Sequence, residues 1–309
     1  MLSSTAKNLY WMGRYLHRAK NTARVLESTQ RMALQSGTAE AGVVADVYSL
    51  RTEFLARYPQ GALADLLDFM TLDDSNPSSL VNTVRAARNN ARAERNNLTV
   101  DVWESLNALW LDVAAQTRLP RAMVDRGALL ELVKKQTTMI AGAAQSTLLR
   151  DDAYCFLQLG SYLERADNTT RVLDVKFHRL CPDGDPRHGS TDYYEWSEIL
   201  ACVGAVRTYR RIYHSRIEAA RVAELMVLRR DLPRSVHHCL WQVDLSMREL
   251  SETYGTRGEA DRQAGALHAH VRYARIEDVF ATGLRPYLED LGLRMAQLSE
   301  DIGRQFLFD

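Results

Sequence analysis

The side chains best suited to hold a charged ligand occur in a short pattern that appears twice. Residues 13–26 read GRYLHRAKNTARVL and residues 160–173 read GSYLERADNTTRVL, so ten of the fourteen positions are identical without a gap. Helical amphipathicity repeats the positions of apolar residues, and it does not require the same arginine, asparagine and threonine a second time. An arginine guanidinium binds a carboxylate or a phosphate through two parallel hydrogen bonds. The repeated arginines, Arg18 and Arg165, are therefore the first candidates for chemistry.

Other polar residues of the pattern accompany these arginines. On a helical wheel, the repeated tyrosine, arginine and threonine share one flank of an apolar stripe, and such a flank is expected to face the other copy or a shared cavity. The repeated asparagine lies nearly opposite the stripe, and because its amide competes for backbone hydrogen bonds, a specific partner is expected. The candidates for ligand binding or for a structural network are Arg18, Asn21, Arg165, Asn168, Tyr15, Tyr162, Arg88, Arg92 and Arg234.

Two interpretations of this set stay open. In the structural one, Arg18 and Arg165 bind carboxylates or helix C-terminal carbonyls across the interface between the copies, because an unpaired buried guanidinium is costly. In the functional one, they line a basic pocket for an anionic small molecule or peptide. Glu164 is then the candidate catalytic residue, acting as general acid or base. Burial would raise the pKa of Glu164 and the charge of Arg165 would lower it.

Other kinds of site find little support in the spacing. His237-His238 and His268-x-His270 lack a third ligand at helical spacing, and no E-x-x-H pair occurs, so no metal is expected. The chain has no glycine-rich phosphate loop and no nucleophile elbow, and no cofactor is predicted. Lysine plus arginine equal aspartate plus glutamate, 39 against 39, which argues against nucleic acid as a partner.

Composition places the chain among soluble globular proteins, with 46% hydrophobic and 25% charged residues over 309 positions. No stretch approaches the roughly 18 uninterrupted apolar residues of a membrane span, so no membrane partner is expected. The first residues lack the apolar region of a signal peptide. The four cysteines form no C-x-x-C pair, and a reducing cytoplasm is the predicted setting.

The elements that must position the candidates are helices. Apolar residues recur at steps of three and four, as in Leu9, Met12, Leu16, Ala19, Ala23 and Leu26, and no alternating β-branched run is present. We predict an all-α protein of about twelve helices in two pseudo-symmetric tandem halves. Residues 1–149 and 150–309 form these halves, packed as one helical body because no linker separates them. Helices are expected near 43–58, 62–71, 99–117, 121–147, 193–214, 215–229, 259–274 and 276–305.

The chain resembles the alpha-E family, a bacterial all-helical family named for its glutamate-arginine motif. In this sequence the family's pair corresponds to Glu164-Arg165 in the second copy and to His17-Arg18 in the first, where histidine replaces glutamate. The resemblance rests on YWMGRYLHRAKNTARVLE at 10–27, DDSNPSSL with AARNNAR at 73–92, VWESLN at 102–107, RDDAYCFLQLGSYLERADNTTRVLD at 150–174 and LPRSV at 232–236.

Members of that family are usually encoded or fused beside a circularly permuted ATP-grasp protein and a transglutaminase-like protein. The resemblance therefore implies an accessory or substrate-binding helical component of an ATP-grasp amidoligase or peptide-tagging system, with no clear catalysis of its own. The alternative is an enzyme subunit whose own Glu/Arg site acts on a carboxylate or phosphate substrate.

Overall fold

The computed structural model describes residues 1–36, 41–181 and 193–308, and over these residues it contains helices and no strand. The all-α prediction is confirmed. Two short 3-10 turns cover Arg95–Asn97 and Arg121–Met123. The α-helices of the described residues are α1 (Ser3–Ser36), α2 (Ala41–Val47), α3 (Arg51–Arg57), α4 (Leu63–Thr71), α5 (Leu80–Ala93), α6 (Val100–Thr117), α7 (Arg126–Thr147), α8 (Asp152–Leu180), α9 (Tyr193–Cys202), α10 (Val206–Tyr213), α11 (Ala219–Val227), α12 (Val236–Tyr254), α13 (Glu259–Arg272), α14 (Ile276–Thr282) and α15 (Leu284–Gln305).

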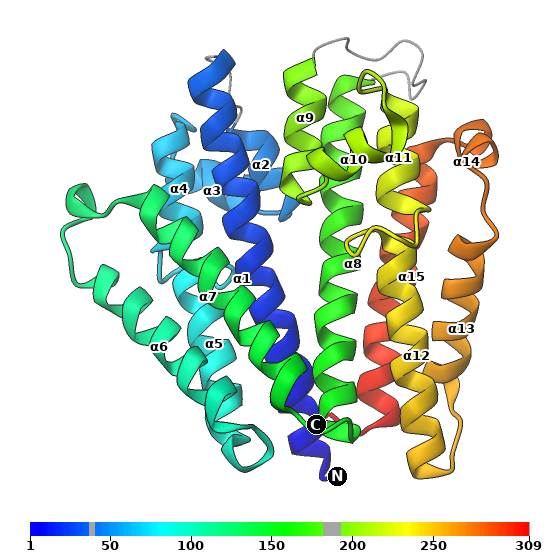
Figure 1. Cartoon of the computed structure of the whole chain (residues 1–309). Coiled ribbons are helices and arrows are strands. Elements are labelled where there is room, and N and C mark those ends of the chain that lie inside the picture. Colours follow the sequence, from blue (N-terminus) through cyan, green and yellow to red (C-terminus); the bar gives the residue numbers. More distant parts are fainter. Residues whose placement is uncertain (37–40, 182–192, 309) are drawn as a thin grey trace.

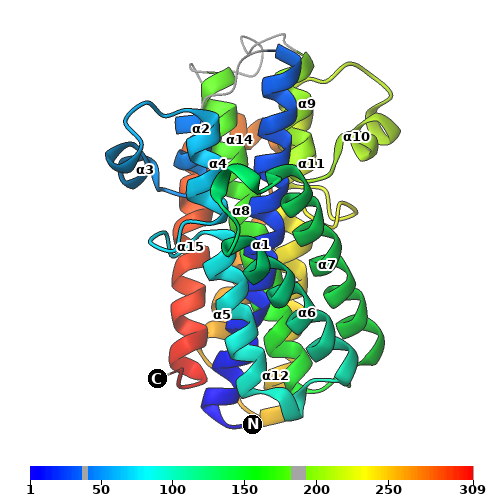
Figure 2. The ribbon, with the colours of Figure 1, turned by 90° about the vertical axis from the view of Figure 1, so that its left-hand side faces the viewer.

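Two long helices, α1 and α8, run side by side through the middle of the molecule (Figures 1 and 2). Helices α5 and α7 pack against α1, and α6 packs against both of them. Helices α12 and α15 pack against α8, and α13 packs against both of those. The two copies of the repeated pattern therefore lie on the helix pair at the centre of the fold. The descent of the two halves from a single duplicated unit stays a prediction.

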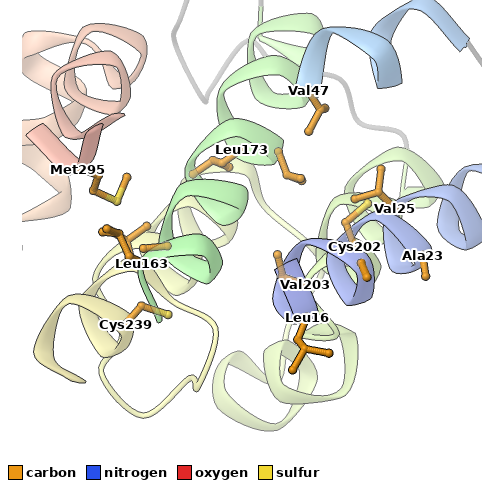
Figure 3. Close-up of a cluster of buried hydrophobic side chains, with 14 of the residues drawn as sticks. Leu16, Ala23, Val25, Val47, Leu163, Leu173, Cys202, Val203, Cys239 and Met295 are labelled. Carbon is orange, nitrogen blue, oxygen red and sulfur yellow. The ribbon is translucent and has the colours of Figure 1, made fainter. Parts of the chain in front are cut away.

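Each central helix buries an apolar stripe, as its periodicity predicts. Every member of the predicted stripe on α1, from Leu9 to Leu26, is buried, and on α8 the matching positions from Leu159 to Phe177 are buried as well. Side chains of both stripes meet residues of α2, α12, α15 and the segment after α9 in the core (Figure 3). Burial of these apolar surfaces, at about 25 cal/mol per Å² removed from water, is the main force that holds the helices together.

The expected number of about twelve helices is wrong, because the described residues contain fifteen. Three predicted segments, 43–58, 193–214 and 276–305, each form two helices. Each break contains a residue with a left-handed backbone: Ser49 with φ of 57°, Gly204 with φ of 70° and Gly283 with φ of 97°. A right-handed helix cannot continue through such a residue, so the apolar periodicity persists while the helix ends and restarts.

No helix in the described part of the chain has the length and apolar character needed to cross a membrane.

Candidate anion-binding site between α1 and α8

Two glycines bring α1 and α8 into close contact at the repeated pattern. A Cβ atom placed on Gly13 would overlap the carbonyl oxygen of Leu157, and one placed on Gly160 would overlap the carbonyl oxygen of Tyr10. The contacts are reciprocal in the register of the repeat, because position 10 corresponds to position 157. The close approach of the two backbones requires residues without a Cβ atom, and it brings the polar side chains of the next turn within reach of the opposite helix.

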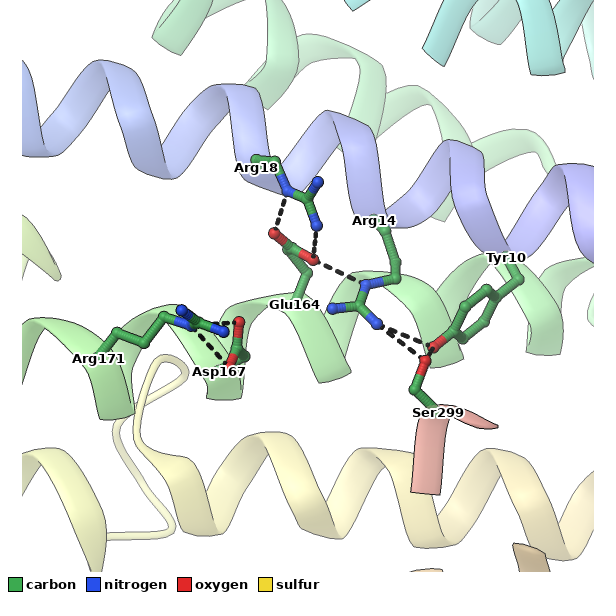
Figure 4. Close-up of polar contacts among 7 residues, drawn as sticks. All are labelled: Tyr10, Arg14, Arg18, Glu164, Asp167, Arg171 and Ser299. Atoms are coloured by element: carbon green, nitrogen blue, oxygen red, sulfur yellow. Dashed lines mark hydrogen bonds and ion pairs between the residues drawn. The ribbon is translucent and has the colours of Figure 1, made fainter. Parts of the chain in front are cut away.

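Glu164 of α8 accepts hydrogen bonds from two arginines of α1 (Figure 4). Arg18 donates from Nε to Oε1 at 2.7 Å and from Nη2 to Oε2 at 3.0 Å. Arg14 donates from Nε to Oε2 at 2.7 Å, and its Nη1 donates to the hydroxyls of Tyr10 at 3.2 Å and Ser299 at 3.0 Å. We call Arg14, Arg18 and Glu164 the Glu164 cluster. Both carboxylate oxygens are occupied, as expected for a structural ion network.

The charge of Glu164 is stabilised by this arrangement. The Glu164 residue is 5% exposed, and burial by itself would raise its pKa. The charges and hydrogen bonds of Arg14 and Arg18 outweigh burial and lower the pKa of Glu164 to about 2. A carboxylate with such a low pKa is a weak base, and it carries no proton to donate near neutral pH. These contacts do not favour Glu164 as a general acid or base.

A second set of basic residues lies at the same helix pair without such a carboxylate. His17, Lys20 and Arg24 are spaced at i, i+3 and i+7 and therefore share one face of α1. Arg165 of α8 and Arg234, from the segment before α12, contribute to the field at these side chains. We call these five residues the basic cluster.

Arg165 and Arg234 are held in place by uncharged acceptors. Arg165 donates from Nη1 to the carbonyl oxygen of Pro233 at 3.0 Å, and its Nη2 lies 3.3 Å from Nε2 of His17. Because the guanidinium can only donate, His17 Nε2 is the acceptor and the neutral ring carries its proton on Nδ1. Arg234 donates from Nη1 to Oδ1 of Asn21 at 2.7 Å. The guanidinium groups are thus oriented without being neutralised.

Several donors of the basic cluster are unused. Within residues 1–36, 41–181 and 193–308, no member of the cluster forms an ion pair with a carboxylate. Glu27, one turn beyond Arg24 on α1, is bound by Lys134 at 2.6 Å, and its charge and that of Glu131 favour the charged form of Arg24 without an ion pair. In the same part of the chain, His17 Nδ1, Arg24 Nε and Arg165 Nε are buried and have no hydrogen-bond partner. Buried donors without acceptors are rare in proteins, and each one calls for a partner.

Burial, with a further contribution from neighbouring cations, lowers the pKa values of His17, Lys20 and Arg234 in the basic cluster. Burial, together with the charges of Arg234, Arg24 and Arg165, lowers the pKa of Lys20 to about 7. Burial and the neighbouring arginines lower the pKa of Arg234 to about 9. Burial and the charges of Arg165, Arg234 and Lys20 lower the pKa of His17 well below its ordinary value. An anion in this place would reverse each of these shifts, because opposite charge favours the protonated forms.

A cavity of about 120 Å³ adjoins the basic cluster between α1, α7 and α8. Its lining includes His17, Lys20 and Arg165 as well as the amides of Gln145 and Gln158, and it contains no carboxylate. The volume corresponds to roughly four water molecules at about 30 Å³ each, which suits a single carboxylate or phosphate group. No three metal-binding side chains converge anywhere among the residues that the structure describes.

The structure brings together most of the residues that the sequence singles out, and it separates two. The rings of Tyr15 and Tyr162 lie beneath the guanidinium groups of Arg18 and Arg165, with distances to the ring centroids of 5.7 and 4.7 Å. Oδ1 of Asn21 accepts from Arg234, whereas its Nδ2 is buried without a hydrogen-bond partner in the described residues, and Asn168 is buried. Arg88 and Arg92 do not join either cluster: Arg88 contacts Asn107 and Trp103 of α6, and Arg92 is exposed near the end of α5.

Sequence reasoning missed Arg14, Lys20 and Arg24 as members of the site. Arg14 is outside the set of repeated residues because serine takes its place in the second copy, and Lys20 corresponds to an aspartate there. The available signal was helical spacing, since Arg14 and Arg18 lie at i, i+4 and face the same way. A search for identities between the copies overlooks residues whose importance lies in the difference between them.

Comparisons with known proteins identify a family and related proteins, but they do not assign an activity. A family model named Alpha-E, described as a predicted alpha-helical domain with a conserved ER motif, matches residues 1–307. Proteins named as uncharacterized from Mycobacterium bovis and Mycobacterium tuberculosis are 25% identical to the chain over 92% of its length and 34% of theirs. The chain thus spans about a third of the length of the curated relatives it matches. No solved structure matches the chain.

Proposed function

This chain belongs to the Alpha-E family, and on that premise we propose that it is a ligand-binding helical protein whose basic cluster holds the acidic group of an anionic small molecule or peptide. The observation that carries the proposal is the group of unneutralised, partly buried cations at the central helix pair. Burying such charges without partners is costly, and an anionic ligand would supply the missing charge.

The Glu164 cluster indicates which group the ligand presents. We propose that α1 and α8 are duplicated elements, so that position 17 corresponds to position 164. Glu164 then supplies a carboxylate to the arginines of α1, while His17 supplies none to Arg165. A ligand carboxylate beside His17 would occupy the counterpart of the Glu164 position. The cavity of about 120 Å³ admits that group, and the remainder of a larger ligand would have to extend out of it.

We further propose that this binding serves an ATP-grasp amidoligase system in the cytoplasm. The family resemblance points to a circularly permuted ATP-grasp protein and a transglutaminase-like protein as partners. An amide ligase activates a carboxylate, so a helical partner that holds a carboxyl-bearing substrate is chemically consistent with such a system. The greater length of the mycobacterial relatives is compatible with an Alpha-E unit acting beside other domains.

The alternative, an enzyme subunit with its own Glu/Arg site, is less well supported. It requires Glu164 to exchange a proton or attack a substrate, whereas both of its oxygens are bound by arginines and its pKa is about 2. The same contacts identify Glu164 as a residue that keeps α1 and α8 together.

Isothermal titration calorimetry with L-glutamate, glutarate and inorganic phosphate tests the proposal. We expect saturable binding to the wild-type chain and at least a tenfold loss in Arg165→Gln. Arg88→Gln is the matched control, because Arg88 lies on α5 outside the cluster, and it should bind as wild type does. Thermal unfolding of each variant separates loss of binding from loss of fold.

His17→Glu provides a second, sharper variant for this experiment. It places the chain's own carboxylate beside Arg165, so binding of L-glutamate and glutarate should disappear while the protein stays folded. If neither L-glutamate nor glutarate binds to the wild-type chain, or if His17→Glu binds them as well as wild type does, the basic cluster is not the proposed site.

A further inference from the structure

A second group of polar side chains lies between α12 and α13, away from the central helix pair. Asp244 of α12 is 4% exposed and His268 of α13 is 7% exposed. His268 Nδ1 lies 2.9 Å from Oδ2 of Asp244, and Arg248 donates to both oxygens of the same carboxylate at 3.0 and 2.7 Å. Because the carboxylate accepts, His268 carries its proton on Nδ1, and Nε2 is the ring atom left for a ligand.

His237 presents a second imidazole in the same way. Its Nδ1 lies 2.8 Å from the carbonyl oxygen of Leu228, which can only accept, so Nδ1 again carries the proton. The residue is 8% exposed, and its Nε2 is buried with no hydrogen-bond partner in the described ranges of the chain. The ring centroids of His237 and His268 are 5.7 Å apart. Two imidazoles are therefore fixed through Nδ1, one of them with an unused buried nitrogen.

Both histidines line a cavity of about 150 Å³. Its other charged lining residues are Arg230, Arg248, Arg272 and Asp244, and the carboxylate of Asp244 is already bound by Arg248 and His268. Arg230 and Arg272 are exposed and have no carboxylate partner in the part of the chain that the structure describes. Arg230 lies over the ring of Trp241 at 4.7 Å from its centroid, which restrains its guanidinium.

We propose that this cavity, the α12–α13 cavity, binds a phosphate group, either as inorganic phosphate or as a phosphomonoester. Both imidazoles line the cavity, and because Nδ1 of each is already bound, Nε2 is the ring atom left to accept from a phosphate hydroxyl. Arg230 and Arg272 are exposed residues of the lining and supply the charge. A tetrahedral group with several oxygens matches this set of donors better than a carboxylate with two. A metal ion fits less well, because two histidines surrounded by three arginines attract anions.

Binding of a dianion should be coupled to protonation of His237. The charged groups that face His237 and His268 are Arg230 from the segment after α11, Asp244 and Arg248 of α12, and Arg272 of α13. In the empty cavity, burial and the nearby basic groups lower the pKa of His237. A bound dianion favours the charged imidazole, so sulfate, whose own charge is constant between pH 6 and 8, should bind several-fold more tightly at pH 6.

The decisive titration uses the His17→Glu variant, in which the proposed site at α1 and α8 is blocked. Inorganic phosphate should still bind with one site per chain, phenyl phosphate should compete with it, and glutarate should not. His268→Gln should weaken phosphate binding at least tenfold. Arg262→Gln is the matched control, because Arg262 lies on the same helix and pairs with Glu259 outside the cavity. If Arg262→Gln also loses phosphate binding, the loss in His268→Gln does not arise from the cavity itself and contradicts the proposed site.

Three outcomes would overturn the proposal: no saturable phosphate binding in His17→Glu, equal binding of glutarate, or Zn²⁺ binding that excludes phosphate and strengthens in Arg272→Gln. If His17→Glu does not fold, a phosphate titration of the wild-type chain, followed through its imidazole NMR signals, takes the place of the titration of the variant. Signals assigned through His237→Gln and His268→Gln should shift with phosphate, and unchanged signals would contradict the site. Because the readout is local to α12 and α13, its failure leaves the proposal for the basic cluster unaffected.

Discussion

The Glu164 cluster and the basic cluster lie on the same two helices and differ in the residue that faces the arginine of the opposite helix. Arg18 meets a glutamate, which binds it through two hydrogen bonds, and Arg165 meets a histidine, which accepts one at 3.3 Å. In the first cluster one carboxylate binds both arginines and has a pKa of about 2. In the second, burial and the neighbouring cations lower the pKa values of Lys20 and Arg234. The residue opposite the arginine therefore decides whether the guanidinium is paired with a carboxylate or only with uncharged acceptors.

The largest effect is expected where the Glu164 cluster is broken. Glu164→Gln removes the charge that compensates Arg14 and Arg18, and leaving buried cations unpaired should reduce the free energy of unfolding by about 3–5 kcal/mol. Urea unfolding followed by circular dichroism measures this change. Asp290→Asn is the control, because its pair with Arg294 is exposed and should contribute less than about 1 kcal/mol. A stable Glu164→Gln variant would remove the structural role assigned to Glu164.

The next effect concerns the close approach that both clusters depend on. Gly160→Ala forces α8 away from the backbone of α1 at Tyr10, and overpacking of this kind should cost about 1–3 kcal/mol. Thermal and urea unfolding measure the loss. Gly142→Ala on α7 is matched, because nothing lies within 4 Å of the added Cβ atom and alanine is the better helix former there. Equal stability of the two variants would mean that the glycine contact does not hold the helices.

A smaller effect, this time a gain in stability, is expected when the basic cluster receives a carboxylate like that of the Glu164 cluster. His17→Glu supplies the basic cluster with a carboxylate and should raise the free energy of unfolding by roughly 1–2 kcal/mol through charge-assisted hydrogen bonds. His178→Glu is the control, because it places a negative charge in the last turn of α8, where the helix dipole disfavours it. Differential scanning calorimetry of the two variants should show shifts of opposite sign. Destabilisation by His17→Glu would mean that the cluster is neutralised in some other way.

The smallest effect is a pH dependence that belongs to the basic cluster alone. Lys20 has a pKa of about 7 in the folded chain and an ordinary value of 10.5, so the unfolded chain binds more protons between these values. Stability should therefore rise with pH across this window, by roughly 1 kcal/mol after solvent screening is allowed for. Lys20→Gln should remove most of this rise in urea titrations at pH 7 and pH 8.5, below the pKa of about 9 of Arg234. An unchanged slope in Lys20→Gln would assign the titration to another group.

Much of the helical architecture could be predicted from periodicity. The stripes from Leu9 to Leu26 and from Leu159 to Phe177 are buried as expected, because a helix with one apolar side must cover it. The breaks at Ser49, Gly204 and Gly283 were not predicted, since a left-handed backbone at one residue leaves the apolar pattern on either side unchanged. Of the candidate residues, Arg88 and Arg92 were misplaced, because an arginine near a motif carries no information about which neighbouring helix it contacts.

The sequence by itself determined the helices, the repeated pattern, and the exchange of glutamate for histidine at position 17, because these follow from local periodicity and identity. Only the tertiary structure decided which charges meet. Arg14 reaches Glu164 because two glycines bring the backbones together, and Arg234 reaches Asn21 from 213 residues further along the chain. Electrostatic energy depends on separation in space and on burial, and neither quantity is encoded in the spacing of residues along one helix.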